Sequence, residues 1–355
     1  MFSAAVGWAQ SEADGVILHT TQGAENWTVA TPALPAGQRI VAVACVDAES
    51  ARLIAATRTS ANEDAAPVEM TFTSWATDDG GSSWVEGGSF SVEQAPGLSW
   101  EGDLDYVDAQ QGWFSANQDN VSTSLGMRLF GTDDGGTRWS EVAWIPPAPA
   151  SPEACFGQPT ATFLTPTTGW LTGGCGPAAF EVTQDGGAGW TSQSLPGDAA
   201  GELDPQPPVF TSSQDGYMLA PNDGGGGMYI YFTGDGGQSW TLRAAPQEWP
   251  HAADFIDADA GWLLSTDTMD AGYPAGLYFT EDGGQSWTTL QGLPFGVPPE
   301  GSTSPLDGSV LDFVTPSLGW TTTFGGDASQ LLQTQDGGQT WSPVTVTVSG
   351  ALPSD

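Results

Sequence analysis

The chain has 355 residues, and its six Arg, absent Lys and 43 Asp and Glu give a formal net charge of −37. A field of this sign repels nucleic acid and anionic membranes, and it favours cationic partners or metal ions at the surface. Adaptation to salt or to an extracellular medium is the alternative, and we favour it over a specific cationic ligand. No apolar stretch approaches the roughly eighteen residues of a transmembrane helix, so we expect no membrane insertion within this chain.

An eight-residue pattern recurs along the chain, and its first copy is incomplete. Residues 20–27 have Gln22 where later copies have Asp, and Ala24 where they have a second Gly. The later copies read Thr-x-Asp-Gly-Gly-x-x-Trp, and successive Trp residues lie 47 to 57 residues apart. The complete copies contain Asp79 and Trp84, Asp134 and Trp139, Asp185 and Trp190, Asp235 and Trp240, Asp282 and Trp287, and Asp336 and Trp341. A period of this size indicates an array of supersecondary units.

Each copy is predicted to form a turn between two strands. Gly takes positive φ without steric cost, and the Asp side chain can accept hydrogen bonds from backbone N–H groups in the turn. Thr favours the strand that enters the turn, and Trp favours the strand that leaves it. We therefore assign these Asp residues to the turns rather than to chemistry, and the Trp residues to packing between units.

A second pattern precedes the turns and predicts a hairpin. Two aromatic residues stand seven apart, with Gly before the second. The pairs are Tyr106 and Trp113, Phe163 and Trp170, Phe210 and Tyr217, Phe255 and Trp262, and Phe313 and Trp320. Hairpin, third strand, Asp turn and fourth strand make a four-stranded antiparallel unit. Seven such units predict an all-β fold, a single seven-bladed β-propeller over residues 1–355.

The first two units depart from the pattern. Met1 takes the aromatic position seven residues before Trp8, so the first strand of blade one is cut short. We expect the natural protein to begin upstream, with the rest of this strand and an export signal or lipid anchor. In the second unit, Ala51 and Arg52 stand where Gly-Trp is expected. At the other end, residues 344–348 predict one more strand.

Three cysteines are present. Cys45 lies in an apolar run and is predicted to be a buried small hydrophobe. Cys155 and Cys175 are placed at one rim of blade four, on neighbouring strands, so we predict a disulfide between them and an oxidising compartment. Two free thiols in a cytosolic protein are the alternative, because spacing alone never proves pairing. No Cys or Cys/His cluster indicates a metal site, and no cofactor is expected.

The Asp turns resemble the Asp-box, or bacterial neuraminidase repeat. Together with the Gly-Trp hairpins, they are most similar to the propeller of the photosystem II assembly and stability factor family. That resemblance implies a non-enzymatic propeller that binds a client protein, partly through a basic patch. Six scattered Arg residues do not make a comparable patch. Asp-boxes also occur in sialidases and xyloglucanase-type hydrolases, so a glycoside hydrolase is the alternative function.

The loops between second and third strands, and the links between blades, are predicted to share the face opposite the Asp turns. Aromatic residues beside carboxylates on that face suit a sugar or a peptide. The candidate ligand-binding residues are Trp100, Glu101, Asp103, Trp144, Trp249, His251, Asp267, Asp270 and Tyr273. The alternative is that these Trp residues fill spaces between blades. We expect an extracellular, periplasmic or cell-surface protein that binds a protein or carbohydrate.

The hydrolase alternative needs particular side chains. A sialidase needs three convergent Arg residues; Arg52, Arg58 and Arg128 stand close to the second and third strands of two adjacent blades, and their convergence is left open. Other glycoside hydrolases need two carboxylates about 5–10 Å apart. With 43 acidic residues, the sequence does not single out such a pair.

Overall fold

The computed structural model describes residues 1–11, 15–58, 68–94, 99–120, 123–146, 155–175, 180–198, 203–221, 228–243, 250–265, 276–290, 310–323 and 330–351. These residues form β-strands without helices, in seven antiparallel four-stranded sheets, and the prediction of a seven-bladed β-propeller is confirmed. The chain divides into two compact units: residues 1–7, 21–27 and 195–348 form the first, and residues 8–20, 28–194 and 349–355 form the second.

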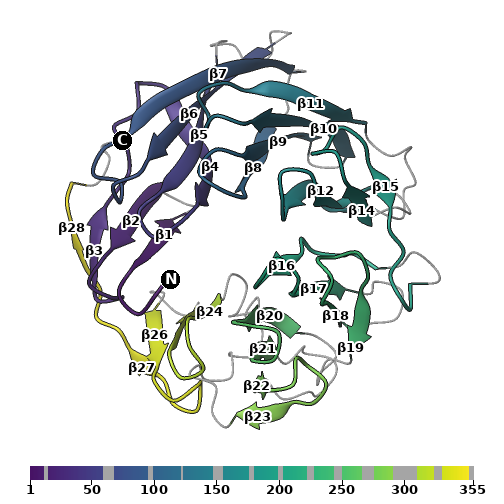
Figure 1. The fold of residues 1–355 in the computed structure, drawn as a ribbon. Helices are drawn as coiled ribbons and strands as arrows, with labels where there is room; N and C mark the ends of the chain where they lie inside the picture. Colours follow the sequence, from purple (N-terminus) through teal and green to yellow (C-terminus); the bar gives the residue numbers. More distant parts are fainter. Residues whose placement is uncertain are drawn as a thin grey trace. The chain divides into compact units, whose positions relative to one another are not determined.

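The second unit contains three complete sheets (Figure 1). One has β4 (Gln38–Cys45), β5 (Ala51–Arg58), β6 (Val68–Thr77) and β7 (Val85–Gln94). The next has β8 (Ser99–Tyr106), β9 (Gly112–Asn120), β10 (Thr123–Thr132) and β11 (Ser140–Ile145). The third has β12 (Cys155–Phe163), β13 (Gly169–Cys175), β14 (Phe180–Thr183) and β15 (Thr191–Ser192).

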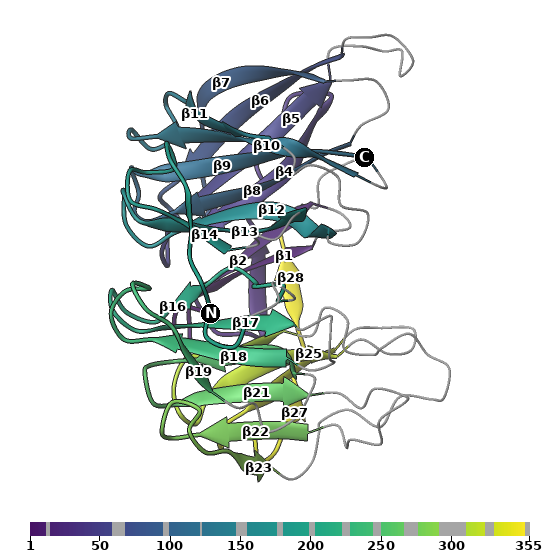
Figure 2. The ribbon, with the colours of Figure 1, turned by 90° about the vertical axis from the view of Figure 1, so that its right-hand side faces the viewer.

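The first unit also contains three complete sheets, and Figure 2 shows β21, β22 and β23 of one of them as neighbouring strands. One sheet has β16 (Val209–Phe210), β17 (Gly216–Pro221), β18 (Met228–Thr233) and β19 (Thr241–Arg243). The next has β20 (Pro250–Phe255), β21 (Gly261–Ser265), β22 (Gly276–Thr280) and β23 (Thr288–Leu290). The third has β24 (Leu311–Phe313), β25 (Gly319–Thr323), β26 (Gln330–Thr334) and β27 (Ser342–Pro343).

The remaining sheet combines the two ends of the chain. Its order is β1 (Gly7–Ser11), β2 (Val16–Thr20), β3 (Asn26–Val29) and β28 (Thr347–Ser349). The strand predicted at residues 344–348 is therefore shorter and lies beside β3. Met1 occupies the position of the aromatic, because a Cβ added to Gly7 would collide with its side chain, as one added to Gly261 would collide with Phe255.

The Asp turns join the third and fourth strands of their sheets, as predicted. In the turn at Asp282, the carboxylate accepts hydrogen bonds from Thr280 Oγ1, from Ser286 N–H and from Ser286 Oγ, at 2.8, 2.8 and 2.6 Å. Gly283 and Gly284 have φ of +63° and +81°, which side chains with a Cβ rarely adopt. These hydrogen bonds, with the Ser286 hydroxyl first, lower the pKa of Asp282 to about 2. The turn is thus fastened by residues within one eight-residue copy.

Six blades tie their two turns together at the same end. In these six blades the N–H of the first Gly of the Asp turn donates to a carbonyl of the turn between first and second strands, and in the incomplete copy Gly23 donates to Ala5, which precedes β1. The pairs are Gly23 and Ala5, Gly80 and Glu49, Gly135 and Gln110, Gly186 and Thr167, Gly236 and Gln214, Gly283 and Asp259, and Gly337 and Ser317. These two turns therefore lie at the same end of the blade.

Aromatic residues pack neighbouring blades together within each unit. Trp113 of β9 stacks on Phe163 of β12 with ring centroids 3.7 Å apart, and Trp262 of β21 stacks on Phe313 of β24 at the same distance. Inside its own blade, the Trp of the Asp turn adds an edge-on contact to the first aromatic of the hairpin, such as that between Trp287 and Phe255 at 6.1 Å. Gly is required before the second aromatic of each hairpin because the first aromatic ring covers it.

Cys45 was predicted to be buried, and that prediction is wrong, because its side chain is exposed. Cys45 ends β4 opposite Ala51, where other blades have the first aromatic. β4 has one neighbouring strand, β5, so its apolar residues are not all covered by the sheet. An apolar run in an edge strand therefore does not guarantee burial.

Candidate functional site: an apolar hollow on three first strands

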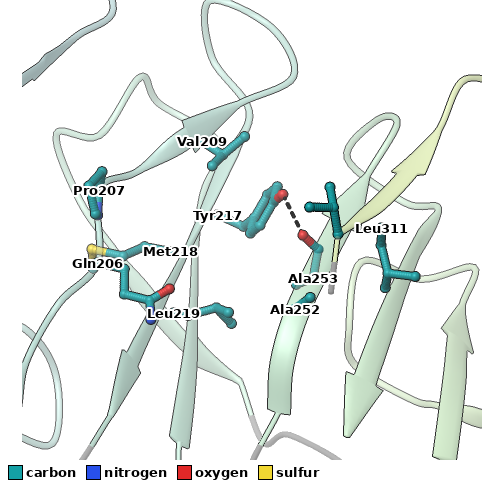
Figure 3. A pocket seen from close by; sticks show the side chains of 10 residues that line it. Gln206, Pro207, Val209, Tyr217, Met218, Leu219, Ala252, Ala253 and Leu311 are labelled. Carbon is teal, nitrogen blue, oxygen red and sulfur yellow. Dashed lines mark hydrogen bonds between the residues drawn. The ribbon is translucent and has the colours of Figure 1, made fainter. Parts of the chain in front are cut away.

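The first strands of three consecutive blades in the first unit surround a hollow of about 230 Å³. Figure 3 shows its lining side chains, which come from β16, β17, β20, β24 and the residues just before β16. The lining residues are Gln206, Pro207, Val209, Tyr217, Met218, Leu219, Ala252, Ala253, Val310 and Leu311. The lining is therefore mainly aliphatic, with two polar side chains.

Local sequence explains why this position is hollow. Pro207 and Pro208 lack the N–H that a strand donates to its neighbour, so β16 is only two residues long. Before it, residues 203–208 follow β17 through bonds from Asp204 N–H to Pro221 and from Gln206 N–H to Leu219, at 2.9 and 2.8 Å. On β20, Ala252 and Ala253 are too small to fill the space between the neighbouring first strands.

The polar groups that line the hollow are poorly suited to proton transfer. The Tyr217 hydroxyl donates to the carbonyl oxygen of Ala253 at 3.0 Å, as Figure 3 shows. Burial raises the pKa of Tyr217 well above its ordinary value, so the hydroxyl stays protonated. The other polar lining residue, Gln206, does not titrate. Among the described residues that line the hollow, none is a carboxylate, an imidazole or a thiol.

Two carboxylates lie next to the hollow in sequence. Asp254 follows Ala253 on β20, and its Oδ2 accepts a hydrogen bond from the N–H of Phe313 on β24. Burial raises the pKa of Asp254 to about 6, against the lowering effect of that bond, and the charge of Asp312 adds to the rise. Asp312 itself accepts a hydrogen bond from the amino group of Met1.

The same arrangement occurs in the second unit. Asp105 of β8 accepts a hydrogen bond from the N–H of Phe163 on β12 at 2.6 Å, and burial raises its pKa to about 6. Asp105, Asp254 and Asp312 each precede the residue that ends the first strand of a blade, and each bonds to the next blade. Recurrence at equivalent positions indicates that these carboxylates join blades. Sequence reasoning missed them, although an Asp before the aromatic in three hairpins was a visible signal.

The arginines do not converge. Arg52 of β5 donates to Thr77, Asp78 and Ala109, while Arg128 of β10 forms two bonds to Glu141 at 2.8 and 3.0 Å. Arg52 and Arg58 lie at opposite ends of β5, which at about 3.3 Å per residue separates them by roughly 20 Å. Arg52, Arg58 and Arg128 therefore do not form the convergent triad that a sialidase needs.

The other arginines lie away from the hollow. Arg138 bonds to Asp134 inside its Asp turn at 2.7 Å. Arg243 of β19 donates to Gly283 of the next blade and lies over the ring of Phe232. Arg39 lies in β4. Four of the six arginines therefore have assigned local partners, and none of these belongs to the hollow.

The predicted ligand-binding residues that the structure describes do not gather in loops. Asp103 lies in β8, exposed, and accepts a hydrogen bond from Thr160 Oγ1 of the next blade at 3.1 Å. Trp144 lies in β11, 41% exposed, with the Arg128 guanidinium 5.0 Å from its ring centroid. β8 and β11 are the two edges of one sheet, so these side chains are on strands about 14 Å apart.

The remaining predicted ligand-binding residues, or their side chains, lie outside the described part of the chain. Trp100, Glu101 and His251 are in strands β8 and β20, but their side chains are outside the described part. Trp249, Asp267, Asp270 and Tyr273 lie outside the described residues altogether. Ligand binding by these residues stays a prediction. Within the described ranges, no group of three or more His, Cys, Asp or Glu is placed to hold a metal ion.

No family model matches this chain, and neither does any curated protein. Among solved structures, the xyloglucanase of Xanthomonas campestris has a TM-score of 0.59 and 16% identity over 95% of this chain and 51% of its own. YCF48 bound to D1 peptide has a TM-score of 0.48 and 20% identity over 87% and 83% of the two chains. YCF48 of Cyanidioschyzon merolae has a TM-score of 0.48 and 16% identity over 87% and 86%.

These likenesses bear on the fold alone. The match to the xyloglucanase supports the propeller, and the chain spans about half of that enzyme's length. In the part of the chain that the structure describes, no helix has the length and apolar character needed to cross a membrane.

Proposed function

We propose that this protein is a non-catalytic Asp-box propeller that binds a segment of another protein, as an assembly-type propeller does. The observation that carries the proposal is the hollow on β16, β20 and β24, which is apolar and whose described lining residues include no carboxylate, imidazole or thiol. Binding sites with apolar walls and few polar groups suit side chains of a ligand, whereas hydrolysis needs a positioned acid and base. The Gly-Trp hairpins and Asp turns supply the resemblance to the assembly factor family.

We further propose that the protein works outside the cell or in a periplasm. Two features support this location. The sequence is strongly acidic and contains no lysine. The disulfide predicted between Cys155 and Cys175 requires an oxidising compartment. A thiol count on the natural protein and fractionation of the producing cells test this part separately.

A glycoside hydrolase is the second candidate, favoured by one observation. Asp254 and Asp312 stand on neighbouring first strands, and Asp254 has a raised pKa, as a general acid needs. Asp105 argues against this assignment, because it has the same bond and the same raised pKa in a blade without the hollow. We therefore assign the pair to joining blades.

Arrays of peptides and glycans, read with the purified protein, test the proposed function. We expect binding to peptides and no release of sugar from xyloglucan or a sialoside. Hydrolysis above a protein-free blank that disappears in Asp312→Asn would replace the proposal with the hydrolase. Retained folding of that variant, checked by its melting temperature, makes the loss interpretable.

A further inference from the structure

The hollow is the size of a side chain rather than of a whole ligand. Its volume of about 230 Å³ is below the roughly 300–1,000 Å³ of pockets for drug-sized molecules. An engineered apolar cavity of about 150 Å³ is enough to bind benzene. A single branched aliphatic or small aromatic side chain therefore fits the space, while an oligosaccharide does not.

The rim of the hollow is apolar and uncovered. Val209 and Val310 are 48% and 57% exposed, and they stand on β16 and just before β24, on either side of Ala252 and Ala253. Covering exposed apolar surface of this kind with a partner's apolar group makes binding more favourable. The Tyr217 hydroxyl already donates to Ala253, so the polar groups that sugar hydroxyls require are scarce.

Charge narrows the class of partner. Residues 195–348 contain one arginine, Arg243, and no lysine, against a chain charge of −37. Arg243 donates to Gly283 and lies over Phe232, away from the hollow. Asp254 and Asp312, which directly follow lining residues, already bond to Phe313 and to the Met1 amino group, so the negative field comes from the acidic residues of this unit as a whole. Such a field attracts cationic segments and repels anionic ones.

Resting on the proposed function, we propose that the hollow receives a branched aliphatic side chain of an extended, positively charged segment of a partner protein. The aliphatic side chain fills the space between Val209, Ala253 and Val310. Flanking Arg or Lys residues face the acidic surface. The apolar group fixes the position of the segment, and the charges raise the rate of encounter.

Short synthetic peptides test this inference by titration calorimetry. The probes are acetyl-Arg-Ser-Leu-Ser-Arg-amide, its Leu→Ser form, and a form with Glu in place of both Arg residues. Burial of the leucine side chain predicts that the Leu→Ser peptide binds on the order of 10- to 100-fold more weakly. The glutamate peptide is expected not to bind, and added salt is expected to weaken the arginine peptide.

Protein variants locate the binding. Val310→Asp and Val209→Asp are expected to weaken the leucine peptide at least tenfold. Val85→Asp is the matched control, because Val85 is 69% exposed on β7, outside the hollow, and it is expected to leave binding unchanged. Melting temperatures show whether each variant is folded.

Three results overturn the inference: no binding of the leucine peptide at millimolar concentration, equal binding of the leucine and serine peptides, or equal effects of Val310→Asp and Val85→Asp. If array peptides bind without dependence on an aliphatic residue, the proposed function stands and this inference fails. If the array shows glycans alone and hydrolysis is present, both fail.

Discussion

The carboxylate of Asp105 accepts a hydrogen bond from the backbone N–H of Phe163, 2.6 Å away and 58 residues later in the chain. The carboxylate is largely buried, and burial raises its pKa to about 6 from an ordinary 3.8. A group whose pKa is raised on folding favours the folded state when protonated, below about pH 3.8, and this contribution is lost as pH rises through about 6.

Asp105→Asn tests this link. The amide keeps an oxygen that accepts the Phe163 N–H, but it carries no charge at any pH. We expect the wild type to gain about 1–3 kcal/mol of unfolding free energy between pH 7 and pH 4.5 from this group, and the variant to lack that gain. Urea unfolding at the two pH values measures it. Identical pH dependence in wild type and variant would contradict the assignment.

The Asp turns set the acid limit of the fold. Hydrogen bonds from Ser286 and Thr280 lower the pKa of Asp282 to about 2, and the pKa values of the other five turn Asp residues are also lowered. A lowered pKa stabilises the fold above the ordinary value of about 3.8 and ceases to do so as pH falls through the folded value. We expect the melting temperature to drop between pH 4 and pH 2. A melting temperature that stays level over that range would be inconsistent with this role.

Within one Asp turn, the Trp is expected to matter more than the Asp. Trp287→Ala removes a large side chain packed against Phe255 and its cluster, at a cost of about 3–5 kcal/mol. Asp282→Ala removes hydrogen bonds near the surface, where water can replace them in part. Thermal melts of the two variants rank them, and a lower melting temperature for Asp282→Ala would reverse the ordering.

Arg52 stands where other blades have the second aromatic of the hairpin, and it also forms a hydrogen bond to the next blade. Its guanidinium donates to the carbonyl oxygens of Thr77 at 2.9 Å and of Ala109 at 3.2 Å, the second of which belongs to the next blade. A lysine ammonium cannot reproduce this fork, so Arg52→Lys should cost about 1–3 kcal/mol.

Arg138→Lys provides the comparison for Arg52→Lys. The Arg138 side chain is 83% exposed, so this change should stay within about 0.5 kcal/mol. Denaturant unfolding of both variants gives the difference. Equal effects would show that the buried fork of Arg52 has no special role.

Cys155 and Cys175 are Cα partners in the pairing of β12 with β13. Directly opposite residues of antiparallel strands have Cα atoms about 4.5–5.5 Å apart, which is within the separation that a disulfide spans. The bond itself stays a prediction, since both side chains lie outside the described part. Unfolded, unreduced protein should show one reactive thiol, from Cys45, and the Cys45→Ser variant should show none. Three thiols in the wild type would exclude the bridge.

The structural features that the sequence predicted are those determined by residues close to one another in the sequence. Each Asp turn is closed by hydrogen bonds within eight residues. The Gly before the second aromatic of each hairpin is required because an aromatic ring of the same hairpin covers it. The bond from Phe163 to Asp105 joins different blades, so a repeat pattern does not reveal it. The hollow depends on short residues in β20, prolines before β16 and valines on β16 and just before β24, and no local signal combines these.

The placement of the arginines has a consequence for proteolysis. Five of the six lie within strands β4, β5, β10 and β19, and the sixth, Arg138, lies in an Asp turn closed by its own bond to Asp134. Proteases cleave extended, mobile segments, and trypsin-like enzymes cut only after Arg or Lys. Arg39, Arg52 and Arg128 lie inside their strands and Arg138 lies inside its turn, so in the described structure these enzymes meet none of these four arginines in an open loop. Tryptic cleavage after these four arginines then reports the fraction of molecules that have opened, which gives a simple assay of unfolding.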